Sequence, residues 1–303
     1  MISRLDDMPW IAHEHGELRF ERQRLVSTRS GTGASLSRYR IPPGARSMPL
    51  HVHADEEELF FVLGGRGWSR QEEEAHEIAE GDVVVHRADR EAHTLFGGHD
   101  ESLDVLAFAS GSATRLTLLP RAGMARIGTR WLPQDAAHPL DSEPPLDAEP
   151  PVGRRPRTIV ALHDVEPTVQ DRGPVHRTRR DLGRAARSRL SGLQHLTVAP
   201  ARRSSVRHCH SHEDEIFVLL EGSATLLLGD ERIAVRPGMV VSRPAATGVA
   251  HAFEAGEDGL VMLAYGTREP ADTCWYPDSR KISFRGLGVI ARVEPLDYWD
   301  GEE

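Results

Sequence analysis

Two short segments of the chain each bring histidines and a glutamate together at a spacing that suits metal coordination. The first is His51-Val-His53-Ala-Asp-Glu-Glu-Glu58 and the second is His208-Cys-His210-Ser-His-Glu-Asp-Glu215, so that both follow the pattern His-x-His-x4-Glu. Imidazole nitrogens with one carboxylate oxygen form a ligand set for a divalent transition metal. The pattern therefore predicts two metal centres.

Each segment is followed by a glycine that opens an apolar run and then by one more histidine. We expect this last histidine to complete each ligand set, which gives His51, His53, Glu58 and His93 in the first half and His208, His210, Glu215 and His251 in the second. Four protein ligands leave positions open for substrate or oxygen, as in catalytic rather than structural sites. We expect one ion per half, with Fe(II) preferred and Mn, Zn, Ni or Cu as alternatives.

The two segments belong to a long internal repeat. The offset of 157 residues between His51 and His208 also separates Gly65 from Gly222. It becomes 158 at the last histidine, because the second loop is one residue longer. A repeat of this size indicates two copies of a whole domain rather than a solenoid. We predict an N-terminal domain over residues 1–132, a linker rich in proline and acidic residues over 133–156, and a C-terminal domain over 157–303.

The positioning elements are predicted to be strands. Residues 59–63 and 216–220 are short apolar runs, each with a glycine within the next two residues, and Gly229-Asp230 has the composition of a hairpin turn. In a strand, residues i and i+2 share a face, so each His-x-His pair aims into one cavity. Phe60 and Val62 should follow Glu58 inward, and Phe217 and Leu219 should follow Glu215. The class is all-β, with two small antiparallel barrels.

These motifs resemble those of the cupin superfamily, and their duplication resembles bicupins. The first family motif matches Gly44 through Gly65, while Ala201 replaces the leading glycine of the second copy. The resemblance implies two tandem cupin barrels of the double-stranded β-helix or jelly-roll type, and it suggests a homodimer. The closing motif is fuller in the second half, with Gly238, Pro244, Gly248 and His251, so we favour the C-terminal centre as the working one. One copy could also be a scaffold for the other.

Several polar residues lie beside the predicted ligands. We interpret most of them as structural or solvated: Cys209 as a packed thiol, Asp55, Glu56 and Glu57 as an acidic rim (or a substitute ligand), His212 and Asp214 as solvated loop residues (or a proton shuttle), and His86 as a strand-end residue (or a partner of a ligand). The arginine-rich stretch 154–189 is interpreted as a solvated strand face, with an anion-steering patch as the alternative. The aromatic residues of 274–277 and 298–299 are expected to pack on the barrel or at a subunit interface.

Composition narrows the function classes. The 37 basic and 46 acidic residues give a net charge of −9, which argues against a nucleic-acid binder. No apolar run is long enough to cross a membrane, and no secretion signal is visible at the N-terminus. The two cysteines have no motif partner, so we expect reduced thiols and a cytoplasmic location.

Three functions fit the predicted sites. The first is a mononuclear metal-dependent oxidoreductase, dioxygenase-like, acting on a small organic molecule. The second is a redox-neutral isomerase, epimerase or decarboxylase that uses the metal as a Lewis acid. The third is a bicupin that binds a small ligand without turnover. The fold alone does not choose among them.

Overall fold

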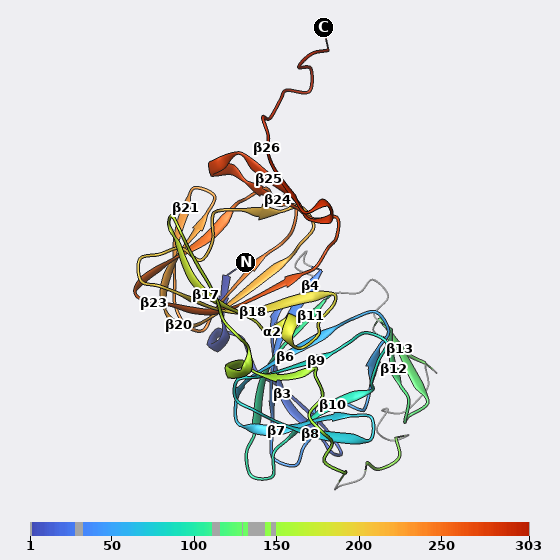
Figure 1. Ribbon diagram of the computed structural model, residues 1–303. Helices are drawn as coiled ribbons and strands as arrows, with labels where there is room; N and C mark the ends of the chain where they lie inside the picture. The colour runs from blue at the N-terminus through green and yellow to red at the C-terminus, as the bar shows by residue number, and fades with distance from the viewer. Residues whose placement is uncertain are drawn as a thin grey trace.

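The computed structural model describes residues 2–27, 33–110, 116–128, 130–132, 143–146 and 150–302. The chain forms two lobes built almost entirely of antiparallel strands (Figure 1). The blue and green N-terminal half makes one lobe, and the yellow to red C-terminal half makes the other. The all-β prediction is confirmed.

The N-terminal lobe contains a seven-stranded sheet of order β15-β9-β6-β11-β4-β3-β2, a three-stranded sheet of order β10-β7-β8 and a four-stranded sheet of order β14-β13-β12-β5. Its own strands are β2 (Ile11–His15), β3 (Leu18–Val26), β4 (Ala34–Ile41), β5 (Val52–His53), β6 (Glu58–Gly64), β7 (Arg66–Gln71), β8 (Glu74–Ala79), β9 (Asp82–His86), β10 (His93–Gly97), β11 (Leu103–Ser110), β12 (Leu116–Leu119), β13 (Met124–Ile127) and β14 (Arg130–Leu132).

The C-terminal lobe contains an eight-stranded sheet of order β1-β22-β20-β23-β18-β17-β16, with β21 paired to β20, and a four-stranded sheet of order β19-β24-β25-β26. Its own strands are β16 (Thr168–Arg172), β17 (Val175–Asp181), β18 (Ser191–Val198), β19 (Cys209–His210), β20 (Glu215–Leu228), β21 (Glu231–Val235), β22 (Met239–Arg243), β23 (His251–Thr267), β24 (Thr273–Tyr276), β25 (Lys281–Phe284) and β26 (Val289–Arg292). The break between β20 and β21 falls at the predicted Gly229-Asp230 turn.

Among the described residues, helical structure is confined to short segments. They are η1 (Leu5–Asp7), η3 (Leu162–Asp164), α2 (Leu182–Ala185), η4 (Pro277–Ser279) and η5 (Arg285–Leu287). None of the helices in the described ranges has the length and apolar character that crossing a membrane requires.

The two lobes exchange their first strands. β1 (Ile2–Arg4) pairs with β22 of the C-terminal lobe, with Ile2 opposite Val241. β15 (Ile159–Ala161) pairs with β9 of the N-terminal lobe, with Ile159 opposite Val84. Both pairs obey the 157-residue offset, so the exchange is symmetric. The predicted domain boundaries stay a prediction, because each half completes a sheet of the other.

The strands that begin with the predicted glutamate ligands are apolar on both faces, and the packing explains why. Phe60 and Val62 of β6 belong to the N-terminal barrel core, as predicted. The intervening Leu59 and Phe61 belong to a second core between the lobes, where Phe108 stacks on Tyr265 with ring centroids 5.2 Å apart. β20 repeats the arrangement, with Phe217 and Leu219 inside its barrel and Ile216 and Val218 in the shared core. Burial of both faces produces continuous apolar runs in place of an alternating pattern.

The glycines that end these runs are required by close packing. Gly65 and Gly222 adopt φ angles of +77° and +74°. A Cβ atom would lie 1.9 Å from Ser102 O at the first position and 2.2 Å from Gly259 O at the second. Only glycine fits both the backbone conformation and the space.

The predicted linker is described only at residues 143–146 and 150–156, and these parts pack on the N-terminal lobe. The Glu143 carboxylate is buried and lies 2.9 Å from Arg46 Nη2. It also accepts a hydrogen bond from the backbone of Leu50, one residue before the first predicted ligand. Val152 forms a parallel bridge with Ala75. The described part of the predicted linker therefore contacts and supports the segment that carries His51.

Candidate metal centres

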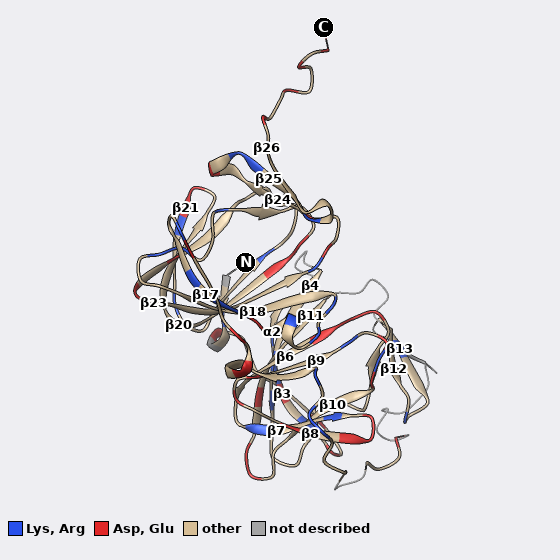
Figure 2. Ribbon diagram, viewed as in Figure 1, with Lys and Arg blue, Asp and Glu red and all other residues tan. Residues whose placement is uncertain are grey.

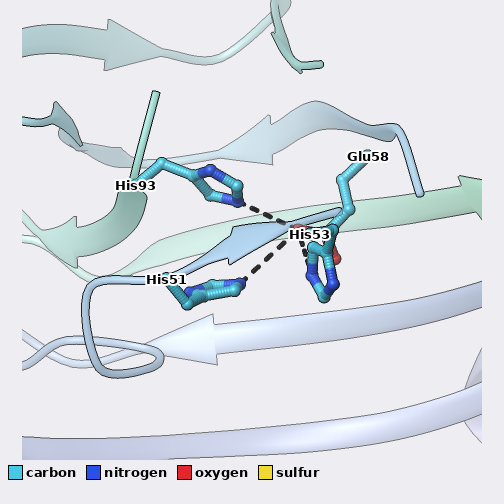
Figure 3. Close-up of side chains that lie close together, drawn as sticks. All are labelled: His51, His53, Glu58 and His93. Atoms are coloured by element: carbon cyan, nitrogen blue, oxygen red, sulfur yellow. Dashed lines mark hydrogen bonds and ion pairs between the residues drawn. The ribbon is translucent and has the colours of Figure 1, made fainter. Parts of the chain in front are cut away.

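The N-terminal set forms a compact cluster (Figure 3). The rings of His51 and His53 have centroids 5.0 Å apart, and an antiparallel bridge pairs His51 with His93 at the start of β10. Glu58 enters from the start of β6. Its Oε2 lies 3.8 Å from His51 Nε2, 3.4 Å from His53 Nε2 and 3.2 Å from His93 Nε2. All four ligand atoms therefore converge, as the spacing predicts.

The other nitrogen of each imidazole is held by the surrounding chain. His51 Nδ1 lies 2.9 Å from Pro49 O, and His93 Nδ1 lies 3.1 Å from Glu91 O. His53 Nδ1 lies 3.1 Å from Thr117 Oγ1 on β12. An Nδ1–H donated to a carbonyl leaves the Nε2 lone pair free, which is how histidine ligands are oriented around metals.

Burial and charge set the protonation of this cluster. Burial, reinforced by the charge of His93, lowers the pKa of His51 to about 4. Burial acts to raise the pKa of Glu58, but the charge of His53 and hydrogen bonds from the imidazoles hold it well below its usual range. Burial also opposes the charge of His53, yet the adjacent Glu58 carboxylate raises its pKa to about 8. A metal would have to displace the proton from His53.

His86 corrects one sequence interpretation, because it is not a plain strand-end residue. Its ring is buried and stacks on His93, with centroids 3.8 Å apart and planes 4° apart. It stands opposite Glu58 in the β6–β9 register. Burial lowers its pKa well below the usual range, so the ring is neutral. His86 packs behind a ligand and fixes its orientation.

The C-terminal set uses equivalent elements but is more open. His208 bridges to His251 at the start of β23, and His210 and Glu215 lie on β19 and β20. Glu215 Oε2 lies 3.1 Å from His251 Nε2 and 3.6 Å from His210 Nε2. His208, Glu215 and His251 converge within 4.8 Å of one another, while His210 groups with His208 and Cys274. The four predicted ligands surround one space without closing on one point.

A carboxylate that the sequence analysis missed supports this centre. Asp272 Oδ2 lies 2.8 Å from His210 Nδ1, and Asp272 Oδ1 accepts hydrogen bonds from the backbone of His212 and Glu213. Burial acts to raise the pKa of Asp272, but the hydrogen bond with His210 lowers it to about 2. An ionised partner makes His210 a stronger donor to a metal. No motif surrounds Asp272, so only its tertiary position identifies it.

Two further residues from the same region border the centre. Cys274 lies opposite His210 in the β19–β24 register, and burial raises the pKa of its thiol to about 12. The Tyr276 ring stacks on His208, with centroids 6.0 Å apart. This segment was expected to pack on the barrel or at a subunit interface. Tyr298 and Trp299 do not pack on the barrel, being 83% and 70% exposed.

The cavities differ more than the ligand sets. The C-terminal ligands line a cavity of about 690 Å³, whose walls include Arg177, Arg179 and Tyr276. The N-terminal ligands line a cavity of about 280 Å³ that is walled partly by Phe20 and Tyr39. Arg172, Arg177 and Arg179 of the stretch 154–189 line this C-terminal cavity, so for these three residues the interpretation as a solvated strand face is incomplete.

The remaining acidic neighbours have specific roles. Glu57 does not belong to a solvated rim: its buried carboxylate accepts hydrogen bonds from Ser188 Oγ at 2.5 Å, Arg189 N at 2.9 Å and Ser191 Oγ at 3.0 Å in the other lobe. Asp214, its counterpart by the repeat offset, is also buried and accepts hydrogen bonds from Ala245 N and from the backbone of Gly33 in the N-terminal lobe. Each ligand loop is thus anchored to the opposite lobe.

His212 is exposed, as expected, whereas Glu213 is buried. Burial raises the pKa of Glu213 to about 7, although it contacts Arg285. Glu213 lines the larger cavity, so it offers a carboxyl group that can gain or lose a proton near neutral pH. Cys209 is buried and does not belong to any ligand cluster of the described residues, consistent with a packed thiol.

Comparison with known proteins agrees with this architecture. The family model of the cupin domain matches the chain twice, over residues 37–108 and 194–265. The oxalate decarboxylase of Bacillus subtilis is similar in structure, with a TM-score of 0.59 at 17% identity over 88% of this chain and 75% of that chain. A second structure of that enzyme, described for its Mn(II) centres, has a TM-score of 0.60 at 16% identity over 90% of this chain and 78% of that chain.

A putative sugar phosphate isomerase of Acidithiobacillus ferrooxidans is 24% identical over 46% of this chain and 97% of that chain, with a TM-score of 0.42. No curated protein matches the chain by sequence. The two family matches, one in each lobe, show that the chain belongs to the cupin superfamily and is a tandem bicupin.

Proposed function

We propose that the chain is a divalent-metal-dependent enzyme that acts on a small organic molecule at its C-terminal centre. The observation that carries the proposal is that His208, His210, Glu215 and His251 all line one cavity of about 690 Å³. A volume of this size accepts a small molecule beside the ligands. The donor set of three imidazoles and one carboxylate suits a divalent metal, with Fe(II) preferred and Mn, Zn, Ni or Cu as alternatives.

The residues of the chain prepare this site in definite ways. Asp272 holds His210 by its Nδ1, and Val206 O holds His208 Nδ1 at 2.8 Å, so both rings turn Nε2 toward the cavity. Burial acts to raise the pKa of Glu215, but the charges of the imidazoles keep it strongly lowered, so the carboxylate stays ionised. When bound, the metal supplies a Lewis acid and, for iron or manganese, a redox centre.

Oxidation of the substrate with dioxygen is the first candidate reaction, because four protein ligands would leave positions on a bound metal for substrate and oxygen. Oxygen consumption by the anaerobically purified, Fe(II)-loaded chain should depend on an added substrate. Activity of the wild type that is lost in His210→Ala and retained in His53→Ala would support the C-terminal assignment. The reverse pattern would move the function to the N-terminal centre.

A redox-neutral decarboxylation or isomerisation is the second candidate, and Glu213 favours it. Such reactions move a proton, and Glu213 is a cavity-lining carboxyl whose pKa of about 7 suits that task. The fold is also that of a bicupin oxalate decarboxylase. Turnover without oxygen, retained with Zn(II), would select this reaction class over the first.

Elemental analysis decides whether either reaction applies. We expect close to one divalent ion per lobe in the wild type, and loss of one ion in each single histidine variant. Protein that holds no metal under any preparation would instead leave the non-catalytic ligand-binding bicupin. The homodimer and the cytoplasmic location stay predictions, and light scattering tests the first of them.

A further inference from the structure

One wall of the C-terminal cavity is formed by β17, which carries Arg177 and Arg179 toward the ligands. The two positions are i and i+2 on a strand and therefore share a face, and both side chains line the cavity with His208 and Glu215. Figure 2 shows basic residues along β17 in the C-terminal lobe. Burial, followed by the charge of Arg179, lowers the pKa of Arg177, so the two guanidinium groups are near neighbours.

Neither cation forms an ion pair with another described residue, although the charge of Glu215 acts on Arg177. Arg177 donates to the neutral oxygens of Gln170 Oε1 and Ser204 O, each at 2.7 Å. Arg179 forms no ion pair, and its Nε is buried without a hydrogen-bond partner. The nearby Asp171 is already paired with Arg202 at 2.9 Å. Two partly buried guanidinium groups therefore border the cavity without an ion pair of their own, and a bound anion would supply one.

The N-terminal lobe lacks this feature at the equivalent positions. The 157-residue offset makes Phe20 the equivalent of Arg177 and Arg22 the equivalent of Arg179. Phe20 is buried and packs against Tyr39, with ring centroids 5.6 Å apart. Arg22 donates from both Nε and Nη2 to Ser37 Oγ. Arg22 and Arg24 nevertheless line the N-terminal cavity, so each cavity has two arginines on the equivalent strand, and the two pairs differ in position by two residues.

We infer that the C-terminal cavity selects a small organic anion, whose carboxylate or phosphate group binds Arg177 and Arg179 while its remainder reaches the ligand cluster. The planar guanidinium group suits both anions, because it presents paired N–H donors to two oxygens. This inference deepens the proposed function by naming the substrate class of the same site. Sugars and alcohols without a charged group are poor ligands on this view.

The test is a calorimetric titration of the full chain with malonate, 3-phosphoglycerate and the neutral probe glycerol. We expect both anions to bind and glycerol to give no measurable heat. The order of the two anions tells whether the arginines prefer carboxylate or phosphate. Arg177→Gln and Arg179→Gln should each weaken anion binding by about tenfold or more, the loss expected for a charge-assisted hydrogen-bonded contact.

Arg180→Gln is the matched control, since it removes the same charge from the opposite face of β17 and should change the anion affinity less than about twofold. Arg177→Lys keeps the charge without the planar fork, and it guards against a Gln variant that fails to fold. It should bind anions more weakly than the wild type but more tightly than Arg177→Gln. Equal anion affinity in the wild type and in both Gln variants, or glycerol binding as tight as malonate binding, would overturn the inference.

Metal analysis of the same samples separates this inference from the proposed function. Arginine-dependent anion binding by a chain that holds no metal would support the anion site and remove the metal enzyme. Metal in the C-terminal centre, together with anion binding that does not depend on the arginines, would support the metal enzyme and remove the anion site.

Discussion

The two lobes present the same four candidate ligand types on equivalent strands, yet they differ in several of the residues around them. The N-terminal cluster is compact, is steadied at His53 by the neutral Thr117, and faces a small cavity walled partly by Phe20. The C-terminal cluster is open, is steadied at His210 by the ionised Asp272, and faces a larger cavity with unpaired arginines. Both lobes keep the same donor residues, while the cavities beside them differ in volume and in the residues that line them.

This contrast suggests that the metal centres of the two lobes have different roles. A compact, enclosed ligand set is suited to holding an ion as part of the structure, whereas an open set beside a cavity is suited to turnover. The closing motif had already favoured the C-terminal lobe at the level of sequence. The geometry supports the same preference for an independent reason, namely the room and charge available next to the ligands.

Removal of one histidine from each cluster is the strongest test of this division. His210→Ala should abolish turnover, because it removes a ligand from the cavity that admits the substrate. His53→Ala should leave most of the activity while releasing the N-terminal ion. Activity assays combined with metal analysis check both. Equal loss of activity in the two variants would mean that turnover does not depend on the C-terminal centre alone.

The partners behind the equivalent histidines should separate the centres next. Asp272→Asn should weaken metal binding at the C-terminal centre by about 10- to 100-fold, because His210 loses a charged acceptor that orients it. Thr117→Val is the matched change behind His53 and should cost less, because a neutral hydroxyl is lost. Chelator competition measures both affinities. A larger effect of the Thr117 change would reverse the comparison.

The buried carboxylates of Glu57 and Asp214, each of which binds the opposite lobe, provide a third comparison. Glu57→Gln should lower the free energy of unfolding by about 1.5–3 kcal/mol, since three donors of the other lobe lose a charged, buried acceptor. Asp214→Asn disturbs the equivalent contact in the other direction, in which the C-terminal ligand loop binds the backbone of Gly33 in the N-terminal lobe. Urea unfolding at fixed metal content measures both. If neither variant changed stability, the buried carboxylates would not hold the lobes together.

The pH dependence of the metal-free chain gives the smallest expected effect. The pKa of His53 is raised from 6.5 to about 8 by Glu58 against the opposing effect of burial. Its stabilising contribution is therefore complete below about pH 6.5 and is lost as the pH rises through about 8, with a magnitude of at most about 2 kcal/mol. Metal affinity at this centre should move the other way, rising with pH because the proton must leave.

Urea unfolding of the metal-free chain at pH 6 and pH 9, with His53→Asn as the control, checks the sign. The wild type should lose more stability than the variant over this interval. An identical pH dependence in the two proteins would show that His53 does not carry a raised pKa.

Local sequence rules were sufficient for much of this molecule. Because strand side chains alternate, His51 and His53 had to share a face, and Phe60 had to follow Glu58 inward. The constant offset required two copies of one fold. The prediction failed for residues whose environment depends on distant segments, such as His86, which stacks on His93, and Glu57, which is buried by residues 188–191.

The sequence by itself determined the ligand types, their spacing and the all-β class, because these follow from periodicity within a few residues and from an exact duplication. Only the tertiary structure decided that β1 and β15 would be exchanged, that Asp272 would stand behind His210, and that Arg177 would line a cavity where Phe20 fills its counterpart. Those features arise from contacts between segments far apart in the chain. Charge, burial and cavity volume are properties of such contacts, and no local pattern encodes them.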